Sequence, residues 1–296
     1  MMLDQTNCRT DALSAESRRP APMRAATVPG VRQIPPSLDP LVVAQIDDRL
    51  DGVERDDGVR ILWAIESGSR AWGFPSPDSD YDCRFLYVRP VDDYLALRRR
   101  RDVIETPLDD VFDVNGWDLR KALGLLVKGN ATVGEWLRSP IVYRGDATFR
   151  DALLTVADDV VDRAGLARHY VHVARNNLHL LDRSGRLKKF LYALRPALIL
   201  RWLRVHPGAT VPPMDVATLL TESDVTDAAR AVRDLIAVKS ATRELSAAPV
   251  PAELRQFVDA ELSRADEATA RQSRSASNRA AAWERAESAF IELVRG

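Results

Sequence analysis

Two apolar runs, separated by a glycine-serine turn and a pair of aspartates, constrain the fold of this chain more than any other feature. Residues 60–65 and 83–88 are rich in β-branched and aromatic side chains, which favour strands. Between the two runs lie the turn residues 67–69 and, about ten residues further on, Asp80 and Asp82. This order predicts a buried strand, a tight turn into a helix that begins near Arg70, and a second strand that opens at the aspartates.

The spacing of Asp80 and Asp82 points to a metal site. Side chains alternate faces along a strand, so positions two apart point the same way, roughly 6.5 to 7 Å from each other. Two such carboxylates can share one divalent cation, or a pair of cations about 3.5 to 4 Å apart. Carboxylate oxygens are hard ligands, which favour Mg²⁺ or Mn²⁺ over zinc.

The turn ahead of the aspartates has the character of a phosphate-binding turn. The unpaired N–H groups at the start of a helix bind anions. Gly68 allows close approach of the backbone, and Ser69 adds a hydroxyl donor. Residues 75–80 are also typical of an ordinary acidic loop in which Asp and Ser cap turns. A lone Asp-x-Asp would favour that simpler interpretation, but the conjunction of strand, Gly-Ser, Asp-x-Asp and strand favours a nucleotide-transfer site.

These residues resemble the signature of the DNA polymerase β-like nucleotidyltransferase superfamily, a Gly-Ser followed after a short gap by Asp-hydrophobic-Asp. Residues 68–74, 78–82 and 116–123 are most similar to the predicted nucleotidyltransferases associated with bacterial RNA-repair operons. The likeness runs from about residue 58 to about 245. Tyr81 is less apolar than the usual residue between the two acids.

The resemblance implies a third carboxylate on a neighbouring strand. Asp113 is the candidate, because apolar neighbours flank it in a strand-like run, where an ionised group needs a reason to be present. Asp118 is the rival, but it follows an Asn-Gly turn and precedes a helical run, a position where Asp caps helix N–H groups. The predicted catalytic and metal-binding residues are therefore Asp80, Asp82 and Asp113.

The resemblance also implies nucleotide-binding residues. Gly68, Ser69 and Arg70 form the expected phosphate cradle. A basic helix follows the catalytic domain in the family, and Lys189 and Arg195 are its candidate phosphate ligands here. Arg195 directly precedes Pro196, which is expected to kink that helix.

The chain divides by pattern into three parts. Residues 1–38 lack an apolar period and are expected to be a disordered extension, or to follow from a start site placed too far upstream. Residues 39–145 predict an α/β (α+β) nucleotidyltransferase domain with a small mixed sheet. Residues 146–296 predict an all-helical domain with a basic face, because residues 163–206 hold ten Arg or Lys against one acid. The helices are expected over residues 41–53, 92–97, 118–128, 135–137, 148–162, 166–181, 187–205, 224–245, 252–267 and 277–294.

Composition narrows the classes of protein. A net charge of −1 and a pI near 6.5 argue against a protein that coats long nucleic acids by charge alone. The two cysteines, Cys8 and Cys83, make no disulfide framework. There is no apolar run of about 18 to 20 residues and no signal-like core, so no membrane association is expected and the location is expected to be cytoplasmic.

The expected function is metal-dependent transfer of a nucleoside monophosphate from a nucleoside triphosphate to a hydroxyl, with Mg²⁺ or Mn²⁺ and release of pyrophosphate. An RNA 3′ end, such as that of tRNA, is the first candidate acceptor. The alternatives are AMP transfer to a protein or small-molecule hydroxyl, as antitoxin and antibiotic-modifying members of the superfamily perform, and a non-catalytic nucleotide-binding module.

Overall fold

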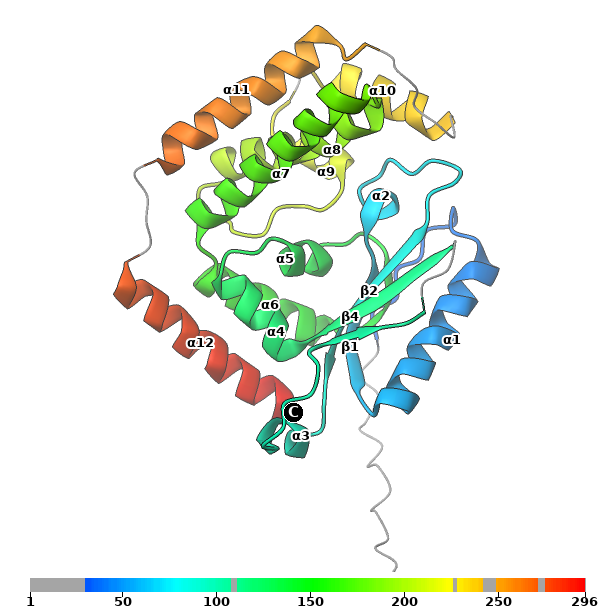
Figure 1. Cartoon of the computed structure of the whole chain (residues 1–296), viewed down its shortest axis with the longest axis vertical. Helices are drawn as coiled ribbons and strands as arrows, with labels where there is room; N and C mark the ends of the chain where they lie inside the picture. Colours follow the sequence, from blue (N-terminus) through cyan, green and yellow to red (C-terminus); the bar gives the residue numbers. More distant parts are fainter. Residues whose placement is uncertain (1–29, 108–110, 226–227, 242–248, 271–274, 296) are drawn as a thin grey trace, which may run out of the picture.

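The computed structural model describes residues 30–107, 111–225, 228–241, 249–270 and 275–295. It confirms the predicted fold class, a mixed sheet with helices followed by a largely helical region (Figure 1). The predicted extension falls mostly on residues 1–29, which lie outside the described residues. Within residues 30–38, Val31 and Gln33 form backbone hydrogen bonds with β5.

Five strands form one sheet in the order β3-β4-β2-β1-β5. The β2–β4 pair is parallel, whereas the β1–β2, β1–β5 and β3–β4 pairs are antiparallel. The four-residue strand β5 was not predicted from the sequence. The strands are β1 (Arg60–Glu66), β2 (Tyr81–Val88), β3 (Val103–Glu105), β4 (Phe112–Asp118) and β5 (Val142–Gly145).

Helix α1 (Pro40–Asp57) covers one face of the sheet. Asp39 caps its first turn by accepting a hydrogen bond from the backbone N–H of Leu41 at 2.8 Å, and Pro40 suits the first helical position. Gly58 ends the helix in the left-handed conformation, with φ of 63°. The buried side of α1, including Ile46 and Leu50, packs with the apolar residues of this face.

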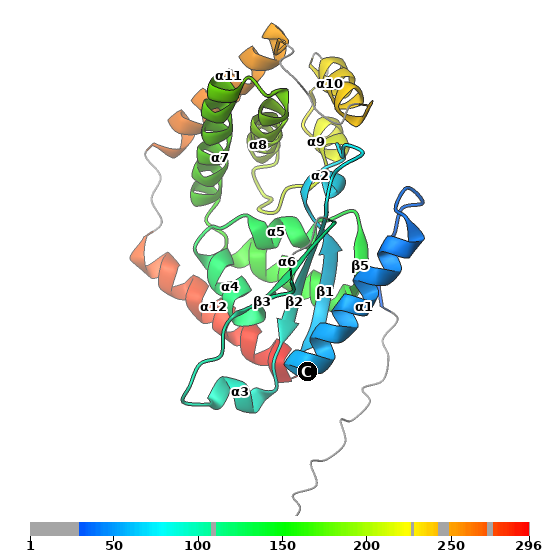
Figure 2. The same cartoon turned by 45° about the vertical axis from the view of Figure 1, so that its right-hand side comes forward.

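Four helices pack against the other face and share one apolar cluster with it. Two of them lie beyond residue 145, and the last one returns from the C-terminal end of the chain to α4 and α6 (Figure 2). The domain boundary at residue 145 therefore stays a prediction, because the sheet and these helices form a common core. The four helices are α4 (Leu119–Val127), α5 (Thr132–Leu137), α6 (Ala147–Val160) and α12 (Ala276–Arg295).

The remaining helices build a second cluster above the end of the sheet where the short helix α2 (Gly68–Ala71) lies (Figure 1). Helix α9 was not predicted, and α10 begins later than the expected start at residue 224. Pro196 lies inside α8, which the structure assigns as one helix. Within the described ranges, no helix is both long and apolar enough to cross a membrane. The helices of this cluster are α7 (Arg163–Ser184), α8 (Leu187–Val205), α9 (Val216–Glu222), α10 (Ala229–Ala241) and α11 (Ala252–Thr269), and α3 (Val91–Leu95) lies apart from it after β2.

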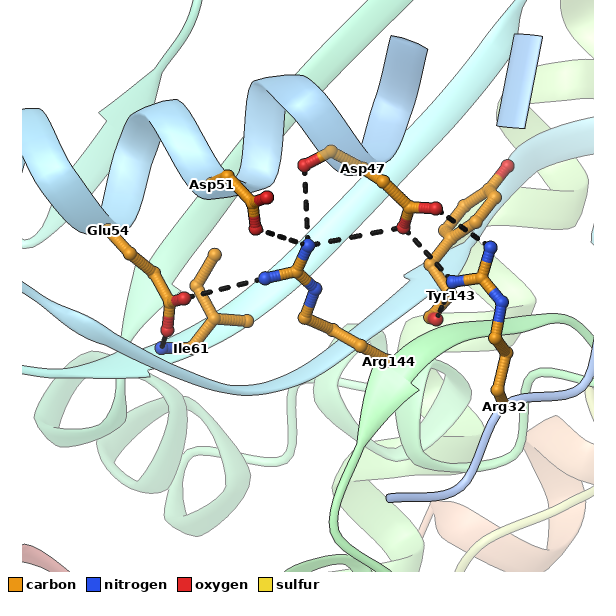
Figure 3. Close-up of polar contacts among 7 residues, drawn as sticks. All are labelled: Arg32, Asp47, Asp51, Glu54, Ile61, Tyr143 and Arg144. Carbon is orange, nitrogen blue, oxygen red and sulfur yellow. Dashed lines mark hydrogen bonds and ion pairs between the residues drawn. The ribbon is translucent and has the colours of Figure 1, made fainter. Parts of the chain in front are cut away.

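The segment before α1 is fastened to the sheet by charged groups (Figure 3). Arg32 donates to both carboxylate oxygens of Asp47, at 3.0 and 2.7 Å, and to the carbonyl of Tyr143 at 2.7 Å. Arg144 pairs with Asp51 at 2.7 Å and Glu54 at 3.4 Å on the same helix. These contacts hold α1 against β5, on the face of the sheet opposite α4, α5, α6 and α12.

Candidate active site

The turn between β1 and α2 depends on Gly68. Its φ is +61°, and a Cβ added there would lie 1.9 Å from Oδ2 of Asp82. A side chain at this position would meet both the steric cost of the left-handed conformation and a direct clash. Gly68 therefore lets the turn backbone approach the Asp82 carboxylate closely, which is the arrangement expected from the Gly-Ser spacing.

Asp82 and Asp113 lie opposite each other on the parallel strands β2 and β4. The Nη2 atom of Arg84 lies 2.9 Å from Oδ1 of Asp82 and 2.6 Å from Oδ2 of Asp113. Asn115, two residues along β4, donates to the other Asp113 oxygen at 3.1 Å. Because residues two apart share a strand face, all four side chains converge on one surface of the sheet.

Burial raises the pKa of Asp82, and the positive charge of Arg84 opposes that rise. The negative charges of Asp113 and Asp80 raise it further. The carboxylates are therefore close enough for repulsion, which a cation between them relieves.

Asp80 lies in the turn just before β2 and is exposed. Its carbonyl accepts a hydrogen bond from Nε of Arg70 at 3.1 Å, and Ser79 accepts one from Nη2 at 2.6 Å. The Arg70 guanidinium also lies over the Tyr81 ring, 3.8 Å from its centroid. The side chain of Arg70 thus fixes the turn that carries Asp80.

Ser69 connects the same two turns. Its hydroxyl donates to the Ser79 hydroxyl at 3.0 Å, and Ser79 in turn contacts Ser76. Helix α2 has only four residues, so its contribution to an anion site comes from local N–H groups rather than from a long helix dipole. The structure thus brings the Gly-Ser turn and the aspartates together in one place.

Glu66 is a buried acid beneath the site that the sequence analysis missed. One carboxylate oxygen accepts the backbone N–H of Asp82 at 3.1 Å, and the other accepts the Tyr143 hydroxyl at 2.7 Å. Burial raises the pKa of Glu66 to about 7, although these two hydrogen bonds lower it. Glu66 is a charged residue at the end of an apolar strand, directly before the Gly-Ser turn. This place in the sequence was the available indication that it is buried next to the site.

Tyr192 of helix α8 packs against the residues that follow α2, with its ring centroid 5.5 Å from that of Trp72. Burial raises the pKa of Tyr192, and the negative charges of Asp82 and Asp80 contribute to the rise. The ammonium groups of Lys188 and Lys189 each lie 5.7 Å from the centre of the Tyr192 ring. Lys189, predicted as a phosphate ligand, therefore lies on the helix that packs beside the end of α2, and its role stays a prediction.

Arg195 lies deeper in α8 and is 4% exposed. Its Nε donates to the Met214 carbonyl at 2.9 Å, and its Nη1 pairs with Glu135 at 3.0 Å. The guanidinium lies over the Trp72 ring, 4.8 Å from the centroid. Two of the three guanidinium nitrogens thus bind protein groups. The predicted contact of Arg195 with a phosphate is not tested by the structure and stays a prediction.

The two candidates for the third carboxylate lie at opposite ends of β4. Asp118 accepts the backbone N–H of Arg120 at 2.8 Å as the N-cap of α4, which is the role predicted for it. It also accepts the Tyr94 hydroxyl at 3.0 Å. Asp113, at the other end, lies beside Asp82.

The oxygen ligands of Asp82 and Asp113 fit a divalent cation of the Mg²⁺ class, because one guanidinium nitrogen already lies between them where a cation would bind. Among the residues that the structure describes, no group of three His, Cys, Asp or Glu side chains is arranged to hold a metal ion. Asp82 and Asp113 lie side by side on neighbouring strands, and metal binding by Asp80, Asp82 and Asp113 stays a prediction.

Much of the positive charge expected on the helical region is paired. Arg201 and Arg204 contact Glu261 of α11, at 3.4 and 3.0 Å, and Arg175 contacts Asp266 of the same helix. These pairs fasten α11 to α7 and α8. The acids of α11 come much later in the chain than residues 163–206, so local charge counting could not reveal the pairing.

Comparison with known proteins agrees with this geometry. Residues 42–292 match the model of a family described as RlaP, the RNA repair pathway DNA polymerase beta family. The chain belongs to this family. It is also 39% identical over 227 residues to the uncharacterized protein YcgL of Bacillus subtilis strain 168, an alignment that covers 76% of this chain and 86% of the relative. The resemblance inferred from residues 68–82 is thereby confirmed: the chain is a member of the RNA repair pathway DNA polymerase beta family.

Proposed function

We propose that this chain is a metal-dependent nucleotidyltransferase that moves a nucleoside monophosphate from a nucleoside triphosphate to a hydroxyl acceptor. The carrying observation is that Asp82 and Asp113, on neighbouring parallel strands, share one guanidinium nitrogen directly beside the Gly68 turn. Membership of the polymerase β family supports the same chemistry.

Each part of the site has a role in this proposal. Asp80, Asp82 and Asp113 would hold Mg²⁺ or Mn²⁺, which when bound neutralises phosphate charge and lowers the pKa of the attacking hydroxyl. Gly68 and Ser69 contact the triphosphate through backbone N–H groups and a hydroxyl, and Arg70 holds the Asp80 turn in place. Lys189 and Arg195 are the proposed basic ligands from α8.

The reaction joins the acceptor oxygen to the α-phosphorus and breaks the bond from that phosphorus to the bridging oxygen of pyrophosphate. The hydroxyl proton is lost to water, and pyrophosphate leaves. The residues of this chain contribute by positioning the two reactants and by placing charge where it develops.

An RNA 3′ end, such as that of tRNA, is the proposed acceptor, because the family is tied to RNA repair. The pairing of Arg175, Arg201 and Arg204 with α11 leaves a limited basic surface, which suits a short or structured end better than a long strand.

The test uses purified protein with α-³²P nucleotides, MgCl₂, and either tRNA or cell-lysate protein. Label is expected to move into the tRNA pool, and Asp82→Asn is expected to abolish the transfer while leaving the fold intact. Full transfer by Asp82→Asn would refute the assignment of the site. Label in the protein pool alone would favour AMP transfer to a protein, the second candidate. Tight triphosphate binding without Mg²⁺ dependence or pyrophosphate release would favour a non-catalytic module.

A further inference from the structure

A cavity of about 390 Å³ lies between the start of α7, the end of α8 and the second half of α11. These three helices pack together in the helical cluster (Figure 1). Arg204, which lines the cavity, is about 18 Å along α8 from Tyr192, the residue of this helix that packs beside the end of α2. None of the residues proposed for nucleotide transfer lines this cavity.

Small side chains make room for the cavity. Ala164 and Ala167 of α7 line it together with Ala265 and Ala268 of α11. Its volume falls within the roughly 300 to 1,000 Å³ that is typical of pockets for small molecules. The space is therefore large enough for a charged group together with the organic group that carries it.

A buried carboxylate in the cavity wall contacts three guanidinium groups. The side chain of Glu261 is 2% exposed, and its Oε1 atom has all three contacts. The partners are Arg201 at 3.4 Å, Arg204 at 3.0 Å and Arg264 at 2.8 Å. A buried carboxylate must be paired, but it offers a single negative charge. The arginines around Glu261 therefore carry more positive charge than this acid neutralises.

Arg163 adds a further positive charge to the cavity wall. Its Nη2 donates to the Leu203 carbonyl at 2.6 Å, near the end of α8. Burial lowers the pKa of Arg163, and no neighbouring acid opposes the shift. A guanidinium nevertheless stays protonated in proteins. Three arginines and one glutamate thus line the cavity, which leaves a surplus of two positive charges.

Two of these arginines are accessible to a ligand. The side chains of Arg204 and Arg264 are 42% and 53% exposed, and both line the cavity. Arg264 contacts Glu261 through Nη1, and Arg204 does so through Nε and Nη2. Among the contacts of the described residues, the other nitrogens of these two guanidinium groups donate to no protein group. An acceptor can therefore bind them without breaking their contacts with Glu261.

We propose that this cavity binds a phosphate group carried by an organic molecule, with Arg204 and Arg264 donating to its oxygens. The planar guanidinium matches phosphate oxygens in geometry. A phosphate monoester carries about 1.5 to 2 negative charges at neutral pH, which matches the surplus in the cavity wall. The phosphate comes either from the backbone of an RNA or from a free phosphorylated small molecule. This inference goes beyond the proposed function, because the cavity is separate from the proposed reaction centre.

The first test measures binding of inorganic phosphate to the full-length protein by calorimetry, in EDTA and at constant ionic strength. Arg264→Gln is expected to weaken binding about five-fold or more. The variant should fold, because Arg201 and Arg204 still pair with Glu261. The matched control is Arg255→Gln on the same helix, which also removes an ion pair, with Asp259 at 3.1 Å, but does not line the cavity.

Ala268→Phe separates binding in the cavity from a general effect of charge. Ala268 is exposed and lines the cavity, so a phenyl ring there should fill it without changing any charge. Binding of the probe that responds to Arg264→Gln is expected to fall by a similar factor. Ala252→Phe, at the exposed start of α11, should have no effect. Full binding by Ala268→Phe would show that the ligand does not enter the cavity and would overturn the proposal.

Titrations with tRNA at several salt concentrations, also in EDTA, distinguish the two sources of phosphate. If RNA is the source, Arg264→Gln should weaken tRNA binding and reduce the slope of log affinity against log salt by roughly 0.7 to 0.9 for each lost phosphate contact. A loss for inorganic phosphate alone would identify a free phosphorylated molecule as the ligand. If Arg264→Gln and Arg255→Gln behave alike with both probes, or if the wild type binds neither probe, the proposal is wrong. Because no divalent cation is present, these results do not depend on whether the chain transfers nucleotides.

Discussion

At the scale of single residues, Gly68 lets the backbone of the turn lie directly against the Asp82 carboxylate. Gly68→Ala should destabilise the fold by about 1 to 2 kcal/mol through the left-handed conformation, and it should also displace the Asp82 carboxylate. If the proposed metal site exists, MnCl₂ should stabilise the wild-type protein, and this stabilisation should be lost in the variant. Urea unfolding with and without MnCl₂ measures both effects.

Gly58 offers a matched control for this substitution. Its φ is +63°, but a Cβ there would meet nothing within 4 Å. Gly58→Ala should show a similar backbone cost and retain the full effect of MnCl₂. If both variants retain it equally, the close approach of Gly68 to Asp82 has no part in metal binding.

Local patterns in the sequence led to the acids of the proposed site, but they could not predict which side chains surround those acids. Asp82 was recognisable from the local spacing, and Asp113 from an ionised group within an apolar run. Glu66 and Arg84 were missed, because their partners come from β5 and β4 and depend on the register of strands far apart in the chain. The assignment of catalytic roles to these acids still awaits experiment.

At the scale of elements, Arg84 is the counter-ion that lets β2 and β4 bring two carboxylates together. Arg84→Met should cost about 1 to 2 kcal/mol of stability without divalent cations, a moderate value because the pair is partly exposed. MnCl₂ should then stabilise the variant more than the wild type, since a cation replaces the missing charge. Thermal melts across a MnCl₂ titration provide the measurement, with the exposed Arg60→Met as control. A smaller gain in Arg84→Met than in the wild type would contradict this view.

Lys239 links α10 to the loop after α2 by donating to the Phe74 carbonyl at 2.5 Å. Burial lowers its pKa from 10.5 to about 8, Lys188 lowers it further, and Asp78 opposes the shift. The unfolded chain therefore binds more protons between these two values, and this group makes stability rise as pH increases from about 8 to 10.5. Relative to Lys239→Met, the wild type should gain about 2 to 3 kcal/mol over that range, measured by urea unfolding. A difference that stays constant with pH would show that the ammonium is not desolvated.

The sequence could place the helices whose apolar residues recur with a clear helical period. Helices α1, α7, α8 and α11 were predicted within a few residues, because each carries a long apolar stripe. Strand β5 and helix α9 escaped prediction, since each is short and is stabilised by partners from other parts of the chain. Val216 at the start of α9, for example, donates to the Trp72 carbonyl at 3.0 Å.

At the scale of the whole molecule, α12 closes the chain onto the sheet. Ala282, Ala286 and Ala289 are buried against α4 and α6, so there is no room for a larger polar side chain. Ala286→Glu should lower stability by about 3 kcal/mol or more, because it buries an unpaired carboxylate. Ala281→Glu, on the exposed side of the same helix, should cost less than about 0.5 kcal/mol. Calorimetric melting of both variants tests this, and equal melting temperatures would mean that α12 does not support the core.

The bridge between Gln33 and Val142 has a consequence for solution behaviour. Strand β5 ends the sheet, and the backbone of residues 31–33 covers its outer side with three hydrogen bonds of 2.7 to 2.9 Å. An uncovered outer strand is a template on which another molecule can add its own strand. Residues 31–33 precede the stretch matched by the family. A shortened version that starts at residue 39 would therefore keep every proposed catalytic group and yet tend to aggregate.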